Sequence, residues 1–418
     1  MKDSKFLLVD INSYFATLAQ QENPYLRNKP LVVVKDLGRT CVIAASKEAK
    51  KLGIKTGSNL HQAKQLVPNL VVIPAEFEMY LSATKKLKKI FCNISPDVQV
   101  YSLDEAFIDL SSCREYLYQD LQQLGQEIQQ QIKRELGDWV TANVGIGNNR
   151  FLAKMAAEIA SKGSVFKIDS DNIDLILATV TFEDVCGVGY RLSKKLSKLG
   201  IYHPYQIRFY RVEDLELWFG SFWSRELLKM AYGEEPHHLS LLNDQRFLSQ
   251  RMRSVSRSIT AWQKITDLSE IKRIVLNLSR EVIYKARRMN LSGRQVGLYL
   301  IGGDNICWGK HLTFKDFINH TKEMVQLFAQ WFDHDWRGQF APIKFVVFLS
   351  LLEPNDKHVN SLLPSWQKNE SLEAALDAID DKYGLHTVRS GLMIQSKAVI
   401  QPEVTGFLGD QDYQFNYR

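Results

Sequence analysis

Three acidic residues stand beside apolar runs, where a soluble fold rarely places unpaired charge. Asp10 directly follows the apolar segment Phe6–Val9, and Asp104 and Glu105 lie between two further apolar stretches. Buried carboxylates are costly unless they are paired or bind a metal, and clustered carboxylates repel one another. If the two segments are neighbouring strands, a divalent cation would neutralise the cluster, and oxygen-only ligands favour Mg²⁺ or Mn²⁺. Two such ions can hold the attacking and leaving oxygens of a phosphoryl transfer.

A lone aspartate at the end of a strand is more commonly a turn or cap residue, and Asp109 is interpreted in that way. The other three acids depend on the elements around them. Strands are predicted at 5–10, 30–35, 71–74, 98–110 (a hairpin) and 140–147, and helices at 46–52, 79–94, 113–136 and 150–161. This alternating order predicts an α/β sheet covered by helices.

The character of the chain changes after about residue 165. Residues 168–233 are predicted to be all-helical, and 234–250 form a polar connector. A second, α+β unit follows, with strands at 255–262, 294–301, 307–314 and 342–350, and helices at 268–289 and 318–333. One clear helix, 371–383, is predicted in the remaining stretch.

The composition is that of a soluble globular protein. The chain has 418 residues, of which 45% are hydrophobic and 24% charged, which excludes a disordered chain, a collagen-like fibre and a small disulfide scaffold. The apolar runs are too short to span a membrane. Asp10 interrupts the first of them, so no signal peptide is expected there. The five cysteines are scattered, so reduced thiols and a cytoplasmic location are expected.

Positive charge is concentrated in the second unit. From 246 to 350 there are 17 Lys and Arg against 8 Asp and Glu, a net charge of +9, whereas the whole chain carries +6. A basic unit attached to a near-neutral body indicates a polyanion partner, and a solvated basic face is the alternative.

Two motifs containing the acids resemble those of the Y-family translesion DNA polymerases. They are Asp10–Ala16 (DINSYFA) and Tyr101–Leu110 (YSLDEAFIDL). Further segments resemble the family's fingers motif, late palm motif and thumb helix-hairpin-helix, at 46–57, 144–154 and 186–201 respectively. The resemblance extends from the first strand to about residue 352.

The resemblance implies a multidomain α/β and α+β right-hand polymerase. A ferredoxin-like palm would comprise 1–20 and 76–165, with small fingers at 21–75. A helical thumb with a helix-hairpin-helix would follow at 166–240, then a basic α+β little finger at 241–352 and a C-terminal extension at 353–418. The extension and the fingers segment are closer to the UmuC type than to the DinB type.

The resemblance also implies the roles of the acids. Asp10 and Asp104 would bind two Mg²⁺ ions, with the carbonyl of Ile11 as a further ligand, and Glu105 would complete the site beside the primer 3′-hydroxyl. Phe15 matches the steric gate, a planar apolar wall that leaves a 2′-hydroxyl without a partner.

Other positions would hold the incoming dNTP. Ser13 and Tyr14 would offer backbone N–H groups to the triphosphate. Many family members have Tyr and Arg on the fingers helix where this chain has Lys47 and Lys50, and lysine lacks the bidentate fork of arginine. Lys162 is offset by one position from the family's late palm lysine; for the fingers lysines, a solvated helix face is the alternative.

Primer–template DNA is the expected partner. The turn containing Gly187 and Gly189 could present N–H groups to a phosphate. Arg251, Arg253 and Arg257 alternate along a predicted strand, so they are expected to form one row that follows a phosphate chain. A sliding clamp is a further candidate partner through Val359–Leu363, although the Gln and Phe of the family's clamp peptide are missing there.

These features together predict a template-directed DNA polymerase of the lesion-bypass type. A catalytically inactive, polymerase-like DNA-binding accessory protein is the alternative, but such relatives lack the three acids. A nucleotide cyclase or an untemplated transferase is a second alternative, which the glycine turn and the basic unit argue against.

Overall fold

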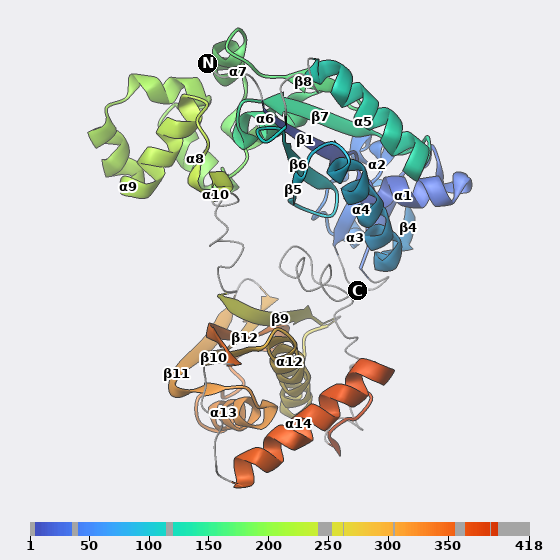
Figure 1. The fold of residues 1–418 in the computed structure, drawn as a ribbon. Coiled ribbons are helices and arrows are strands. Elements are labelled where there is room, and N and C mark those ends of the chain that lie inside the picture. Colours follow the sequence, from blue (N-terminus) through green and yellow to red (C-terminus); the bar gives the residue numbers. More distant parts are fainter. Residues whose placement is uncertain are drawn as a thin grey trace. The chain divides into compact units, whose positions relative to one another are not determined.

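The computed structural model describes residues 5–35, 41–113, 120–240, 253–261, 263–303, 306–355, 364–384 and 386–391. The chain divides into two compact units, residues 1–249 and 250–418 (Figure 1). No helix within these described ranges is long and apolar enough to cross a membrane.

A five-stranded sheet organises the first unit. Its order is β5-β6-β1-β7-β8, formed by β5 (Asp97–Val100), β6 (Glu105–Asp109), β1 (Phe6–Ile11), β7 (Ala142–Gly147) and β8 (Val165–Lys167). The central strand β1 is antiparallel to both neighbours, and only β7 and β8 are parallel. The predicted sheet covered by helices is confirmed, and it is mainly antiparallel.

Alternation along β1 separates two cores. Leu7 and Val9 face α4 (Phe77–Cys92) and α5 (Leu121–Leu136), whereas Leu8 faces the opposite core with Phe107 and α6 (Arg150–Ile159). Successive side chains of a strand point to opposite faces, so Asp10 lies on the α6 face with Leu8. This parity determines which helix can reach the acids.

A smaller three-stranded sheet has the order β3-β2-β4, with β2 (Leu31–Val34), β3 (Val42–Ala45) and β4 (Val71–Pro74). Two short helices pack on it, α2 (Lys47–Lys51) and α3 (Leu60–Leu66), and they share a separate apolar core with it. Ser46 caps α2 by accepting a hydrogen bond from the Ala49 backbone N–H. Gly53 follows with a φ of +86°, a left-handed conformation that favours glycine at the end of a helix.

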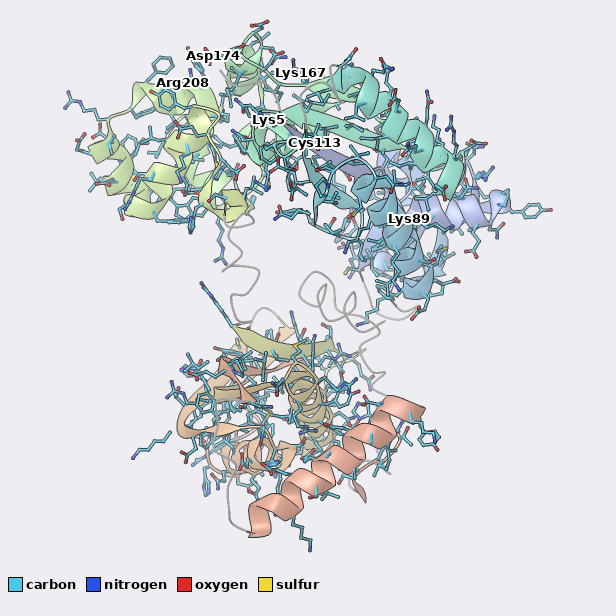
Figure 2. The ribbon with its side chains drawn as sticks, viewed as in Figure 1. Lys5, Lys89, Cys113, Lys167, Asp174 and Arg208 are labelled. Carbon is cyan, nitrogen blue, oxygen red and sulfur yellow. The ribbon has the colours of Figure 1, made fainter. Side chains whose placement is uncertain are left out.

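The rest of the described part of the first unit is helical. It contains α7 (Ile173–Thr179), η3 (Phe182–Asp184), α8 (Tyr190–Lys198), η4 (Pro204–Phe209), α9 (Val212–Ala231) and α10 (His237–Ser240). Gly220 interrupts α9 with a φ of +79°. Arg208 on η4 forms a 2.9 Å ion pair with Asp174 on α7, and both are labelled in Figure 2. The predicted all-helical segment is confirmed.

The second unit contains a four-stranded antiparallel sheet with the order β11-β10-β12-β9. Its strands are β9 (Ser254–Thr260), β10 (Leu291–Gly302), β11 (Cys307–Ile318) and β12 (Pro342–Pro354). The helices α12 (Leu268–Arg288) and α13 (Thr321–His334) pack against the sheet through one shared apolar core. The predicted order of strands and helices is confirmed.

Two helices differ from their predicted ranges by more than three residues at one end. The helix expected at 113–136 is described only as α5, which begins after the N-cap Asp120, and residues 114–119 lie outside the described ranges. The last helix, α14 (Pro364–Tyr383), begins seven residues before the expected start at Ser371. Proline is well tolerated in the first turn of a helix, so Pro364 is compatible with this earlier start.

Candidate active site

Strand register places the three acids at one end of the large sheet. Asp10 on β1 lies directly opposite Glu105 on β6. The backbone N–H of Ile11 donates to the carbonyl oxygen of Asp104 at 3.0 Å. Residues more than ninety positions apart in sequence are therefore neighbours, and the two acidic segments are adjacent strands, as the sequence analysis required.

Ser102 fixes the turn that carries Asp104 and Glu105. Its hydroxyl donates to Asp104 Oδ1 at 2.5 Å, and its oxygen accepts from the backbone N–H of Glu105 at 3.0 Å. Serine commonly stabilises a turn through such local bonds. The role of Ser102 was not predicted from the sequence, although a serine two residues before a carboxylate is the signal that indicates it.

A buried lysine approaches the acids from α6. Lys154 is 6% exposed, and its Nζ lies 2.8 Å from Glu105 Oε1 and 3.4 Å from Glu158 Oε1. Although burial alone lowers the pKa of Lys154, the charges of Glu105 and Glu158 outweigh it and raise the pKa above its ordinary value. The pair of Lys154 and Glu158 was not predicted from the sequence, although its i,i+4 spacing on a helix that is otherwise apolar apart from Arg150 was the available signal.

The protonation of Asp10 reflects this crowding. Burial, followed by the charges of Glu105 and Asp104, raises the pKa of Asp10 from 3.8 to about 7. A carboxyl group that resists ionisation beside two other carboxylates is a site where added positive charge is favourable. Lys154 supplies one such charge at Glu105. The carboxylate oxygens of the three acids are also the kind of ligand that a divalent cation such as Mg²⁺ prefers.

The side chains are nevertheless not arranged as a finished metal site. Within the described ranges, no three His, Cys, Asp or Glu side chains are grouped so that they could hold a metal ion as they stand. Glu105 binds Lys154, and Asp104 accepts a hydrogen bond from Ser102. These contacts occupy one oxygen of each carboxylate.

The segment after Asp10 turns sharply into α1 (Tyr14–Glu22). Ser13 occupies the left-handed region with a φ of +52°, which a non-glycine residue rarely adopts. The Tyr14 hydroxyl is bonded to the Tyr80 carbonyl oxygen and the Thr84 hydroxyl, each at 2.8 Å. Because its side chain is held in the core, only the backbone of Tyr14 is suited to reach a substrate.

Phe15 lies against an aromatic neighbour. It is 8% exposed, and its ring centroid is 4.3 Å from that of Tyr80 with an interplanar angle of 34°. Such contact fixes the orientation of a ring that has few rotatable bonds. Tyr80 was not identified from the sequence, because the pairing of α1 with α4 depends on the tertiary fold.

The three predicted lysines are placed differently. Burial lowers the pKa of Lys50, and the charge of Lys162 lowers it further, whereas Asp10 and Asp104 oppose the change. Lys50 is therefore close enough to interact electrostatically with Asp10, Asp104 and Lys162. Lys47 instead lies over the ring of Trp139, 4.4 Å from its centroid.

The glycine turn before α8 contains two unlike glycines. Gly187 has a φ of +91°, and a Cβ placed there would lie 2.5 Å from the ring of His238. Gly189 is the N-cap of α8, where a Cβ would meet no atom within 4 Å. The backbone thus needs glycine at 187, while 189 leaves the start of α8 open to close approach.

The predicted arginine row needs correction. Arg257 is buried on β9 and forms a 2.5 Å ion pair with Glu281 on α12, so it does not share an exposed face. Side chains do alternate along β9 with a period of two residues. The face that carries Arg257 is the one that packs on the core, where Val255 is also buried. Arg253 is exposed, whereas Arg251 and the predicted clamp segment Val359–Leu363 lie outside the described residues.

Comparison with family models places two regions of the chain in one family. Residues 9–158 match the impB/mucB/samB family, and residues 252–362 match the C-terminal domain of the same family. Together these regions cover more than half of the chain, and the first contains the three acids.

The chain is also similar to curated proteins named DNA polymerase IV. It is 28% identical to the protein of Pelotomaculum thermopropionicum, over 94% of this chain and 96% of the relative. It is 31% identical to that of Xanthomonas oryzae pv. oryzae, over 71% of this chain and 79% of the relative. DNA polymerase IV 2 of Bacillus subtilis is 27% identical over 92% of this chain and 93% of the relative.

Two solved structures share the fold. A Y-family DNA polymerase chimera of Dbh and Dpo4 matches with a TM-score of 0.69 and 24% identity, over 84% of this chain and 99% of the other. An insertion ternary complex of Dbh DNA polymerase matches with a TM-score of 0.55 and 23% identity, over 82% and 98%.

Proposed function

The chain belongs to the impB/mucB/samB family and is a lesion-bypass DNA polymerase of the Y-family, and from this premise we propose that Asp10, Asp104 and Glu105 form its catalytic site. The catalytically inactive accessory protein is not favoured by these relatives. The observation that carries the assignment is the strand register that sets Asp10 opposite Glu105 and beside Asp104.

Y-family polymerases use divalent metal ions, and the acids with the Ile11 carbonyl would hold two Mg²⁺ ions, or Mn²⁺ in their place. When bound, such ions neutralise the carboxylates and the charge that develops on the transferred phosphate. The raised pKa of Asp10 supports this assignment, because the cluster lacks positive charge. Ser102 would orient Asp104 through its hydrogen bond, and Lys154 would hold Glu105 through their ion pair.

The residues after Asp10 would position the dNTP. The turn at Ser13, where φ is +52°, would offer the backbone N–H groups of Ser13 and Tyr14 to the triphosphate, as oriented amides do at other phosphate sites. Phe15, held against Tyr80, would close the space beside the sugar C2′ and exclude a 2′-hydroxyl.

The lysines would attract the triphosphate with different strength. Lys50 interacts electrostatically with Asp10, Asp104 and Lys162, and both lysines would contribute positive charge to the triphosphate. Lys47 would first have to leave the face of Trp139. A cation over an aromatic ring gains about 0.5–1 kcal/mol at exposed sites, so this displacement is inexpensive.

The domain division of the family applies to this chain as a proposal. Palm (1–20 and 76–165), fingers (21–75), thumb (166–240), little finger (241–352) and extension (353–418) fit the order of the observed elements. Primer–template DNA would contact the Gly187 turn and the little finger, where Arg251 and Arg253 remain in the proposed contact row. Clamp binding through 359–363, the closer likeness to the UmuC type and a cytoplasmic location stay predictions.

Primer extension tests the catalytic assignment. Asp104→Ala should retain binding of primer–template DNA and lose nucleotide addition, because the carboxylate acts on the transferred phosphate and not on the duplex. Loss of transition-state stabilisation should lower the rate at least 10³-fold, which corresponds to about 4 kcal/mol. Retained synthesis would show that the acids at this end of the sheet are not the catalytic groups, and reactions without template would separate an untemplated transferase.

A further inference from the structure

A stripe of arginines on α12 is covered by the acidic face of α14. Arg280 pairs with Asp380 at 2.5 Å, and Arg288 pairs with Asp381 at 2.8 Å. Arg287 forms two ion pairs, which join it to Glu373 at 2.9 Å and to Asp377 at 2.6 Å. The acids recur at i, i+4 and i+7 or i+8 along α14, so one face of this helix carries the whole set.

This helix contact consists mainly of charge. The apolar core of the second unit draws its described side chains from the sheet, α12 and α13 and their connections, and none of them from α14. Leu372 on α14 is 57% exposed. A helix that buries little apolar surface depends on its ion pairs, and ion pairs between partly exposed groups weaken as salt rises.

The pair of Arg280 and Asp380 leaves one carboxylate oxygen without a hydrogen bond within the described residues. Asp380 is 3% exposed, yet its Oδ1 has no hydrogen-bond partner among the described residues. A buried carboxylate oxygen without a partner lowers the stability of the contact. The ion pair of Asp380 with Arg280 therefore uses only one of the two carboxylate oxygens.

Guanidinium groups bind phosphate in the same planar, two-bond manner as carboxylate. The 246–350 segment has a net charge of +9, and the chain is a DNA polymerase. We propose that Arg280, Arg287 and Arg288 form a second surface for the DNA phosphate backbone, and that α14 is an acidic clasp that competes with DNA for it. This surface lies on α12 and is distinct from the arginines proposed at the start of β9.

The chain after α14 keeps the clasp close to its site. Gly384 reverses the backbone with a φ of +98°. His386 is then buried, with its Nε2 lying 3.2 Å from Glu281 Oε1, in contact with the buried pair of Glu281 and Arg257. A tethered competitor acts at a high effective concentration, so DNA should displace α14 only where phosphate is abundant and salt is low.

Salt-dependent DNA binding by the full chain tests the proposal. Asp380→Asn with Asp381→Asn removes the carboxylates that pair with Arg280 and Arg288, whereas Arg287 has two acidic partners and would keep one of them after a single change. Each additional phosphate contact steepens the plot of log K against log[salt] by about 0.9 on duplex DNA, so two contacts should add about 1.8. Between 200 and 50 mM salt, affinity should then rise about 10-fold more than in the unmodified chain.

A matched control separates this effect from net charge. Asp333→Asn with Asp335→Asn also removes two negative charges from the second unit and releases Lys272 and Lys310. The control should leave the salt slope unchanged. An equal increase in both double variants would overturn the proposal, since the gain would then come from charge in general.

Two further measurements test whether α12 is the surface that binds DNA and whether α14 is displaced from it. Adding Arg280→Gln and Arg288→Gln to the α14 variant should remove the gain, and a gain that persists would exclude α12 as the surface. Hydrogen exchange on the unmodified chain requires no substitution: amides of α14 should exchange faster when duplex DNA is added at 50 mM salt. Unchanged protection of α14 at saturating DNA would show that the helix is a fixed structural element.

Discussion

Asp10 is expected to destabilise the metal-free protein at neutral pH. Its pKa is raised from 3.8 to about 7 by burial and by the neighbouring acids. Between these values the folded state retains a proton that the unfolded chain has lost, so stability falls as the pH rises from about 4 to about 7. The difference corresponds to about 4 kcal/mol above pH 7.

Asp10→Asn removes this titration and keeps the shape of the side chain. The stability of the variant relative to the unmodified chain should therefore increase by about 2–3 kcal/mol between pH 5 and pH 8. Urea unfolding in the presence of EDTA at both pH values measures this change. Asp138→Asn removes the same charge from an exposed position in the same unit and is the matched control.

A relative stability that stays constant from pH 5 to pH 8 would refute the reasoning, because Asp10 would then ionise as easily in the folded as in the unfolded chain. Adding Mg²⁺ at pH 8 provides a second comparison. The ion should stabilise the unmodified chain more than Asp10→Asn, since it binds the ionised carboxylates of the folded state.

Three further changes test other parts of the site. Phe15→Ala should admit ribonucleotides, and equal selection between dNTP and rNTP before and after the change would remove the gate assignment. Lys154→Met should leave Glu105 and Glu158 without their shared cation and destabilise the metal-free fold by about 3–5 kcal/mol in urea unfolding, whereas a change below about 1 kcal/mol would show that the pair is well solvated. Gly187→Ala should cost about 1–3 kcal/mol, because it strains the positive φ and presses on His238, and it should weaken binding of primer–template DNA; unaltered stability would mean that the turn relaxes freely.

Local sequence patterns were sufficient for the elements and the candidate acids. The interruption of apolar runs by Asp10 and by Asp104 and Glu105 is visible in one dimension, because burial of charge is unusual wherever it occurs. The order of strands and helices in the second unit was likewise predictable, since each element has its own hydrophobic period. Most errors occurred at ends of elements, such as the earlier start of α14 at Pro364.

The face of an element that meets the core, and the partner that a charged side chain finds there, were not predictable from the sequence. The alternation of Arg253 and Arg257 was clear from the sequence, but whether that face meets solvent or the core depends on how α12 covers β9. The structure buries Arg257 against Glu281. An ion pair across two elements leaves no local trace, because either charge by itself resembles a surface residue.

The sequence by itself determined which residues could do chemistry, because residue type and hydrophobic spacing are local properties. Only the tertiary structure decided how they meet. Register set Asp10 against Glu105, the parity of β1 turned Asp10 towards α6, and the packing of α6 brought Lys154 to the same carboxylate. Distances between segments far apart in the chain are fixed by packing in three dimensions, and they decide the charge state and the partners of each acid.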